Sequence, residues 1–162
     1  MKRFLIVSDT HGYNVNFVKA VKAAGKVDAV IHCGDIEGSE YYLSQTAGAP
    51  IYMVQGNNDY YSDIPPEMVF EFGSRKFWVI HGHRYHVNRG LDWLMPVAVS
   101  HGAHIVCYGH SHRPSIKQML GIWFINPGSL TYPRQENRLP SFAVLEIDEA
   151  DKISAEIHYI ED

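Results

Sequence analysis

The chain has 162 residues, of which 46% are hydrophobic and 20% charged, and its formal net charge is −4 with neutral histidines. This length and composition are typical of a single globular domain, which we assign to residues 1–162. The negative net charge excludes a strong basic field for nucleic-acid binding, and no apolar run approaches the length of a membrane span.

The first 55 residues alternate between strand and helix patterns. We expect buried strands at 4–8, 28–33 and 51–55, and helices at 14–24 and 39–47. Asn14 or Asn16 can cap the first helix, Ser39 can cap the second, and Gly25 ends the first. This alternation predicts a parallel sheet with helices packed on its faces.

The remaining chain is richer in strand patterns. Segments 68–72 and 76–80 predict an antiparallel pair, and residues 88–100 predict a helix that Pro96 kinks or ends. Further strands are expected at 104–108, 115–119, 122–125, 142–147 and 153–159. We therefore predict an α/β fold with a two-layered β core and helices on both outer faces, a four-layer sandwich.

The two cysteines and the N-terminus indicate a compartment. Cys33 and Cys107 lie in apolar segments typical of strands, so we expect buried free thiols and no disulfide. The apolar part of the N-terminal segment is too short for a signal peptide. These features predict a cytoplasmic protein.

Five short polar motifs fall mostly at the ends of the expected strands. In chain order they are Asp9-Thr10-His11, Gly34-Asp35, Gly56-Asn57-Asn58-Asp59, His81-Gly82-His83 and Gly109-His110-Ser111-His112. Each of the first three is explained at least as well as a polar turn. A His-x-His pair that leaves a buried strand is harder to explain in this way. Oxygen and imidazole ligands without thiolate suit Mn, Fe, Zn, Ni or Co better than a structural zinc site.

The order of these motifs resembles the calcineurin-like metallophosphoesterase superfamily over roughly residues 4–132. The short chain and the segment 126–129 look most like its small YfcE-like phosphodiesterase branch, which is a four-layer sandwich. The resemblance implies that one metal ion is held by Asp9, His11, Asp35 and His112, and a second by Asp35, Asn57, His81 and His110. Asp35 would bridge two divalent transition-metal ions, with Mn favoured over Ni, Zn, Fe or Co.

The implied function is hydrolysis of a small phosphodiester by a hydroxide that the two ions generate. A phosphomonoesterase acting on nucleotides or small metabolites is one alternative. Another is a non-catalytic scaffold, like the retromer subunit of this fold that has lost much of its metal site, although the complete ligand set argues against it. Related proteins commonly form dimers, so a homodimer is a further expectation.

Asn58 departs from the family pattern, in which many members have histidine at this position. Asparagine can donate hydrogen bonds to a phosphate but cannot supply a proton, so we expect slow hydrolysis of esters with poor leaving groups. His83 is a candidate replacement, or else a hydrogen-bonding partner of a ligand. We assign catalytic roles to Asp35, Asn58 and His83, and interpret Asp59 as only a turn residue.

Other polar residues are given supporting roles. Asn126 and Ser129 are expected to shape the loop near the metal ions, and His32 is interpreted as a core or interface histidine that could also orient a ligand. Candidates for contact with the substrate are Tyr13, Arg84 and Arg134.

Overall fold

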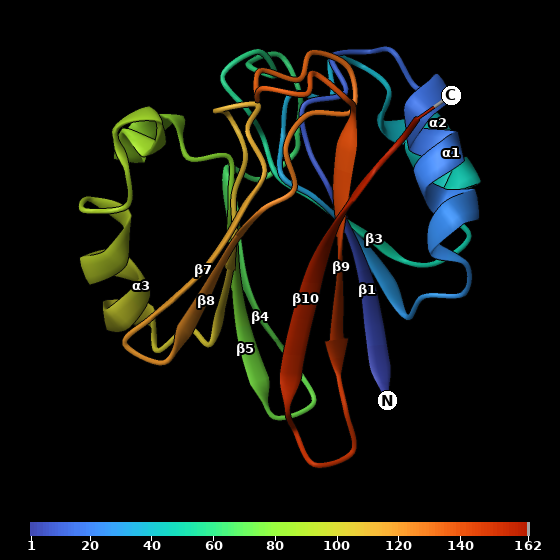
Figure 1. Ribbon diagram of the computed structural model, residues 1–162. Coiled ribbons are helices and arrows are strands. Elements are labelled where there is room, and N and C mark those ends of the chain that lie inside the picture. The colour runs from blue at the N-terminus through green and yellow to red at the C-terminus, as the bar shows by residue number, and fades with distance from the viewer. Residues whose placement is uncertain (162) are drawn as a thin grey trace.

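The computed structural model describes residues 1–161 and contains ten strands, three α-helices and two 3-10 helices (Figure 1). The strands are β1 (Lys2–Val7), β2 (Ala29–His32), β3 (Ile51–Met53), β4 (Glu67–Phe72), β5 (Arg75–Ile80), β6 (Ile105–Cys107), β7 (Ser115–Met119), β8 (Ile122–Asn126), β9 (Ser141–Ile147) and β10 (Ile153–Tyr159). The helices are α1 (Val15–Ala24), α2 (Glu40–Thr46), η1 (His83–Tyr85), η2 (Val87–Arg89) and α3 (Leu94–His101).

Two five-stranded sheets pack face to face, with the orders β10-β9-β1-β2-β3 and β4-β5-β6-β8-β7. The predicted parallel arrangement of β1, β2 and β3 is confirmed, as is the antiparallel β4–β5 pair. Helices α1 and α2 cover the outer face of the first sheet, and α3 covers the outer face of the second (Figure 1). The four-layer α/β sandwich predicted from the sequence is therefore confirmed.

Strand β1 is buried on both faces because successive side chains of a strand point to opposite sides. Phe4 and Ile6 pack between the two sheets, whereas Leu5 and Val7 pack against the layer formed by α1 and α2. All four side chains are fully buried. Because β1 is buried on both faces, its end is held in a fixed position. The first polar motif, Asp9-Thr10-His11, follows this end of the strand.

The predicted helix over 88–100 is wrong in its first half. The chain forms η2, leaves helical geometry at Gly90, where φ is 108°, and begins α3 only at Leu94. Such a φ is favourable only for glycine. Pro96 is the third residue of α3, where its missing N–H would have no helical acceptor, so it neither kinks nor ends the helix.

The predicted side-chain caps are also wrong, although Gly25 does end α1 as expected. Asn14 and Ser39 occupy the N-cap positions of α1 and α2, but neither side chain accepts a capping hydrogen bond. Instead, Asn14 Nδ2 donates to Ser39 Oγ (3.0 Å), and Asn16 Nδ2 donates to the Leu130 carbonyl (2.8 Å). These contacts join the two helices and tie α1 to a distant loop.

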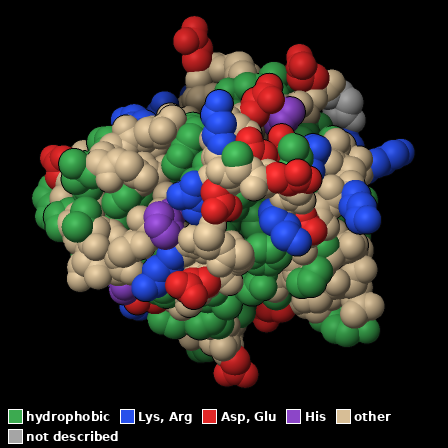
Figure 2. All heavy atoms as spheres, turned by 90° about the horizontal axis from the view of Figure 1, so that it is seen from below, with side chains coloured by type: hydrophobic (Ala, Val, Ile, Leu, Met, Phe, Trp, Pro, Cys, Tyr) green, Lys and Arg blue, Asp and Glu red, His purple; other side chains and the backbone are tan. Residues whose placement is uncertain are grey.

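Both cysteines are buried and free, as predicted. Within residues 1–161 no helix combines the length and hydropathy needed to cross a bilayer. The lower end of the sandwich has acidic and basic side chains interspersed among apolar ones (Figure 2). The polar motifs lie at the opposite end, where β1 and β2 finish (Figure 1).

Replacing Phe77 with alanine is expected to lower the free energy of unfolding by about 3–5 kcal/mol, because it leaves a cavity between the sheets. Phe77 is fully buried, and its ring centroid lies 5.0 Å from that of Phe4. Urea unfolding measures the change. Tyr41→Ala is the control, since Tyr41 is 78% exposed. Equal destabilisation by both variants would contradict a shared core between the sheets.

Candidate metal centre

The polar motifs converge because parallel strands end at the same edge of each sheet. Asp9 and Asp35 follow the parallel neighbours β1 and β2, while His81 and His110 follow β5 and β6, which are parallel neighbours in the other sheet. The side chains of the two sheets meet over the core, where His81 Nε2 lies 3.4 Å from Asp35 Oδ2. Residues from four strand ends thus form one cluster.

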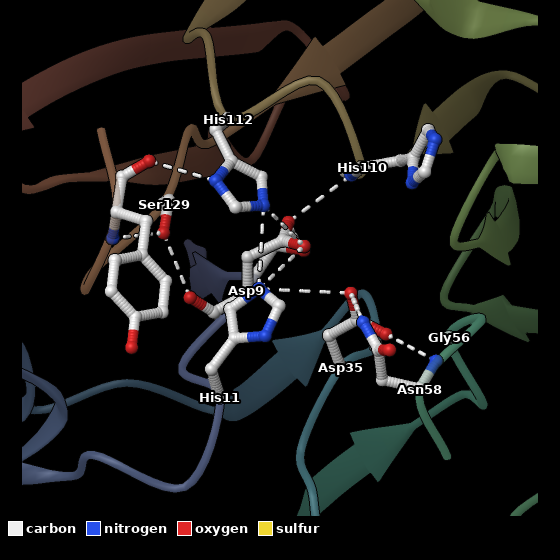
Figure 3. Close-up of polar contacts among 12 residues, drawn as sticks. Asp9, His11, Asp35, Gly56, Asn58, His110, His112 and Ser129 are labelled. Atoms are coloured by element: carbon white, nitrogen blue, oxygen red, sulfur yellow. Dashed lines mark hydrogen bonds and ion pairs between the residues drawn. The ribbon is translucent and has the colours of Figure 1, made fainter. Parts of the chain in front are cut away.

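Asp9 lies at the centre of this cluster, between the rings of His11 and His112 (Figure 3). The residue is fully buried, and within residues 1–161 its Oδ1 atom has no hydrogen-bond partner. Oδ1 lies 3.3 Å from Nε2 of His112, 3.6 Å from Nε2 of His11 and 3.8 Å from Nε2 of His81. A buried carboxylate oxygen is costly unless a cation compensates its charge.

Three imidazoles present the same ring nitrogen to Asp9. Nδ1 of His11 contacts Glu37 Oε2 (2.6 Å), Nδ1 of His81 contacts the Cys33 carbonyl (2.7 Å) and Nδ1 of His112 contacts the Tyr132 carbonyl (2.7 Å). Because these oxygens accept hydrogen bonds, each Nδ1 carries a proton, and in the neutral imidazole the lone pair of Nε2 faces the centre. This is the tautomer that a metal-binding imidazole needs.

The short distance between the Nε2 atoms of His11 and His112 also favours a cation at the centre. Nε2 of His11 and Nε2 of His112 are 3.3 Å apart. Two lone pairs at this distance repel each other unless a proton or a metal ion lies between them. The donor set and its orientation therefore fit a bound divalent cation.

The charged groups stabilise one another. Burial alone would raise the pKa of Asp9, but the positive charge of His81 and the contacts with His11 and His112 hold this pKa well below its usual range. Burial likewise opposes protonation of His81, yet Asp9 and Asp35 raise its pKa to about 9. The positive charge of His81 is that of a bound proton, and a metal ion would compete with this proton for the imidazole nitrogen.

Asp35 lies close to expected ligands of both ions. Its Oδ2 atom lies 3.6 Å from His11 Nε2 and 3.4 Å from His81 Nε2, so it reaches one expected ligand of each ion. Two groups have their ligand atoms within 4.8 Å of one another; they are Asp9, His11 and His112, and Asp9, Asp35 and His81. Asp9 is shared between them in this arrangement.

The other two expected ligands lie at the side of the centre. His110 Nδ1 is 3.2 Å from His81 Nε2, so His110 joins the cluster. Asn57 is exposed on the turn after β3. The next residue, Asn58, donates its backbone N–H to Asp35 Oδ1 (3.0 Å) and its side-chain Nδ2 to Asp35 Oδ2 (3.1 Å; Figure 3). This turn therefore lies against the Asp35 carboxylate.

His83 lies beside the centre, with ring centroids 5.4 Å from His81 and 6.1 Å from His110. Burial, followed by the positive charges of His81 and Arg84, lowers the pKa of His83 to about 4. The imidazole is therefore neutral near pH 7 and can donate or accept a hydrogen bond. Arg84 lines the same cavity of about 220 Å³ as His81 and His83.

Five of the expected ligands have a left-handed backbone, which is uncommon for residues other than glycine. The φ angles are 55° for Asp9, 52° for His11, 61° for Asp35, 70° for His110 and 60° for His112. Aspartate and histidine tolerate this conformation better than β-branched residues do. The turns aim these side chains across the strand ends into the cluster.

Two glycines of the motifs leave room for this packing. A Cβ atom at Gly56 would collide with Asp35 Oδ1, and one at Gly109 would collide with Ser8 Oγ. Ser8 Oγ donates to Asp9 Oδ2 (2.6 Å). Both glycines are therefore required by close approach to a carboxylate or its partner.

Asp59 does more than form a turn, which corrects the interpretation from the sequence. The side chain is buried and accepts hydrogen bonds from four backbone amides, those of Asp35 (2.7 Å), Ile36 (3.0 Å), Glu37 (2.7 Å) and Gly56 (2.8 Å). It thereby holds the loop of Asp35 against the loop of Asn57. No sequence pattern marked this role, because the partners are 22 to 24 residues away for three of the amides.

The sequence also missed Glu37 and Tyr132, which accept hydrogen bonds from His11 and His112 as described above. Glu37 lies two residues after Asp35, a spacing that carries no signal by itself. Tyr132 contributes a backbone carbonyl, which any residue could supply. Its ring centroid is 5.2 Å from that of His11 and 6.2 Å from that of Tyr13, which is 63% exposed. Tyr13 thus lies near the centre, in ring contact with Tyr132.

The loop residues predicted to support the centre do so. Ser129 Oγ donates to the Asp9 carbonyl (2.8 Å), and Asn126 Nδ2 donates to the Gly109 carbonyl (3.2 Å). His32 is fully buried; its Nδ1 accepts from the Gly34 amide (3.1 Å), and its Nε2 lies 3.0 Å from Thr10 Oγ1. His32 is therefore a core residue that links the first two motifs.

Residues 1–150 match the model of the calcineurin-like phosphoesterase superfamily domain. A probable metallophosphoesterase of Bacillus subtilis, YsnB, is 37% identical over 145 residues, which cover 89% of this chain and 83% of that protein.

Two solved structures are similar over nearly the whole chain. A predicted phosphoesterase from Streptococcus pneumoniae has a TM-score of 0.85 at 34% identity, covering 98% of this chain and 89% of its own. A structure described as an archaeal phosphodiesterase has a TM-score of 0.74 at 25% identity, covering 96% of this chain and 99% of its own.

Replacing Asp59 with asparagine is expected to lower the free energy of unfolding by about 2–3 kcal/mol, because one amide oxygen cannot satisfy four N–H donors. Metal affinity should fall as well, since the Asp35 loop loses its anchor. Urea unfolding and calorimetric titration with Mn²⁺ measure the two effects. Asp63→Asn removes an exposed carboxylate from the following loop and is the matched control. Wild-type stability in Asp59→Asn would contradict the anchoring role.

Proposed function

Because the chain belongs to the calcineurin-like phosphoesterase superfamily, we propose that it is a phosphodiesterase that uses two divalent metal ions. The observation that carries this proposal is the Oδ1 atom of Asp9, which is buried without a hydrogen-bond partner among the Nε2 atoms of three imidazoles. That arrangement fits a cation better than it fits a purely structural polar network.

In the proposal, Asp9, His11, Asp35 and His112 hold one ion, and Asp35, Asn57, His81 and His110 hold the other. Bound divalent ions supply a nucleophile by lowering the pKa of water, and they offset charge on the phosphoryl oxygens. Mn²⁺ is the ion we favour, because hard carboxylate oxygens and imidazoles suit it. Asp35 is the catalytic carboxylate that fixes the spacing of the two sites.

Asn58 and His83 orient the substrate phosphate in this proposal. Both flank the centre, and both can donate hydrogen bonds while neutral. A neutral imidazole is a poor proton donor, so His83 would replace the phosphate contact of the histidine that Asn58 displaces, and not its acid function.

Support for a diester substrate comes from the archaeal phosphodiesterase, which has the same fold and 25% identity. A monoesterase and a scaffold remain the rival hypotheses. The scaffold is opposed by the orientation of the three imidazoles, since a protein that binds no metal has no need to expose three lone pairs to a buried carboxylate. A small phosphodiester substrate, a cytoplasmic location and a homodimer stay predictions.

Mn²⁺ reloading of the metal-stripped protein is expected to produce hydrolysis of bis(p-nitrophenyl) phosphate that exceeds hydrolysis of p-nitrophenyl phosphate. Initial rates measure both reactions. Asp35→Asn should lower the diester rate by more than about 100-fold, because it removes the bridging carboxylate. Asp63→Asn should keep the wild-type rate. Faster monoester turnover would favour the monoesterase, and no metal-dependent turnover of either ester would favour the scaffold.

Replacing Asn58 with histidine is expected to raise the rate on a diester with an alkyl leaving group by about 10-fold or more, because histidine can protonate the leaving oxygen. An aryl diester serves as the internal control, since its leaving group needs little protonation and its rate should change far less. Parallel measurements of kcat on the two esters test this. An alkyl rate that does not rise would show that position 58 does not limit leaving-group departure.

A further inference from the structure

A groove of about 420 Å³ lies beside the metal centre, and the proposed hydrolysis leaves it without a role. Its polar lining includes Tyr108, Ser111, Arg113, Ser115, Lys117 and Arg134. The lining contains three basic side chains and no acidic one, although the net charge of the chain is −4. The groove is therefore a local concentration of positive charge.

The three cations of the groove lack carboxylate partners. Within residues 1–161, no ion pair involves Arg113, Lys117 or Arg134. Like charges that line one groove repel each other, and an anion bound between them would remove that cost. The hydroxyl groups of Ser111 and Ser115 add neutral polar groups to the same lining.

The groove begins at the loop that carries two expected metal ligands. Ser111 lies between His110 and His112, and Arg113 follows directly. The Arg134 amide donates to the His112 carbonyl (3.0 Å), which places Arg134 next to the same loop. The groove therefore adjoins the loop that carries His110 and His112.

Two parts of the groove lining are held in place by the fold. Ser111 Oγ accepts hydrogen bonds from Asn126 Nδ2 (2.9 Å) and from the Arg113 amide (3.2 Å). Ser115 and Lys117 are two residues apart on β7, so their side chains point to the same face of that strand. Strand β7 is at the edge of its sheet, which leaves the Lys117 side chain exposed.

We propose that this groove binds a second phosphate group of the substrate while the scissile phosphate lies at the metal centre. The proposal rests on the phosphoesterase function above and narrows its substrate class to small phosphoesters that carry a further phosphate. Arginine guanidinium groups match phosphate oxygens in a bidentate way, and a lysine adds a compact charge. The small volume and the negative net charge of the chain favour a small molecule over a long nucleic acid.

The test compares kcat/KM for a thymidine dinucleotide with and without a 5′-terminal phosphate, in the Mn²⁺-loaded protein. The terminal phosphate should raise kcat/KM by about 10-fold in the wild type, and Lys117→Gln should reduce this preference by about fivefold. The ratio is the readout. Lys117 is the residue substituted because it lies on β7, whereas Arg113 follows His112 directly and the Arg134 amide donates to the His112 carbonyl. An equal rate on both dinucleotides, or an unchanged ratio in Lys117→Gln, would overturn the proposal.

Lys152→Gln is the matched control, because it removes one exposed positive charge from the β9–β10 turn, at the other end of the sandwich. It should keep the wild-type ratio. Loss of the preference in both variants would assign it to the overall charge of the protein and overturn the proposal. A rate that keeps rising with oligonucleotide length would overturn the small-substrate assignment in favour of a nucleic acid.

A binding measurement separates this proposal from the proposed function. Titration of the metal-free protein with inorganic phosphate should shift backbone amide resonances of residues 111–117 and 134 in a saturable way. Lys117→Gln should weaken this binding about fivefold, whereas Lys152→Gln should not. Absence of turnover with saturable shifts would reject the phosphoesterase and keep the anion groove. Turnover without such shifts would reject the groove alone.

Discussion

The Oδ1 atom of Asp9 imposes the main physical constraint on this protein. A charged oxygen that is fully buried and accepts no hydrogen bond costs several kcal/mol unless positive charge compensates it. Three imidazoles turn Nε2 toward this atom, and their Nδ1 atoms are held by oxygens from two loops, β2–α2 and β8–β9. The positions of those loops therefore follow from the need to place a cation beside one carboxylate.

Backbone strain is concentrated at the same place. Five expected ligands adopt left-handed φ angles, each of which costs on the order of 1 kcal/mol or more. Such turns persist only where the surrounding structure holds them, and here the preceding strands are buried and paired on both sides. Asp59 adds a second restraint by collecting four amides from the two loops that carry Asp35 and Asn57. Rigid strands thus carry the strained turns that aim the ligands.

The features that follow from local sequence pattern, the strands and the polar motifs, were predicted. Contacts between loops that are distant in the sequence were missed. Apolar runs located the strands, and polar motifs after them located the centre. The helix over 88–100 was misplaced because one glycine, Gly90, interrupts an otherwise helical composition. Asp59 and Glu37 were missed for a different reason. Their partners come from other loops, so their roles exist only after the strand ends have been brought together.

The residues around the centre change from acidic to neutral to basic with increasing distance from it, and this arrangement affects how a phosphoester can bind. The innermost groups are the carboxylates of Asp9 and Asp35, the neutral donors Asn58 and His83 flank them, and the basic groove lies outside. In the metal-free protein a proton on His81 compensates part of the negative charge of the two carboxylates, and divalent ions in its place would supply the larger positive charge that holds an anionic phosphate. Binding of metal ions must therefore precede productive binding of a phosphoester, whereas the outer cations can attract an anion at any time. The outer groove would then concentrate phosphate-bearing molecules next to a centre that accepts them only in its metal-loaded state.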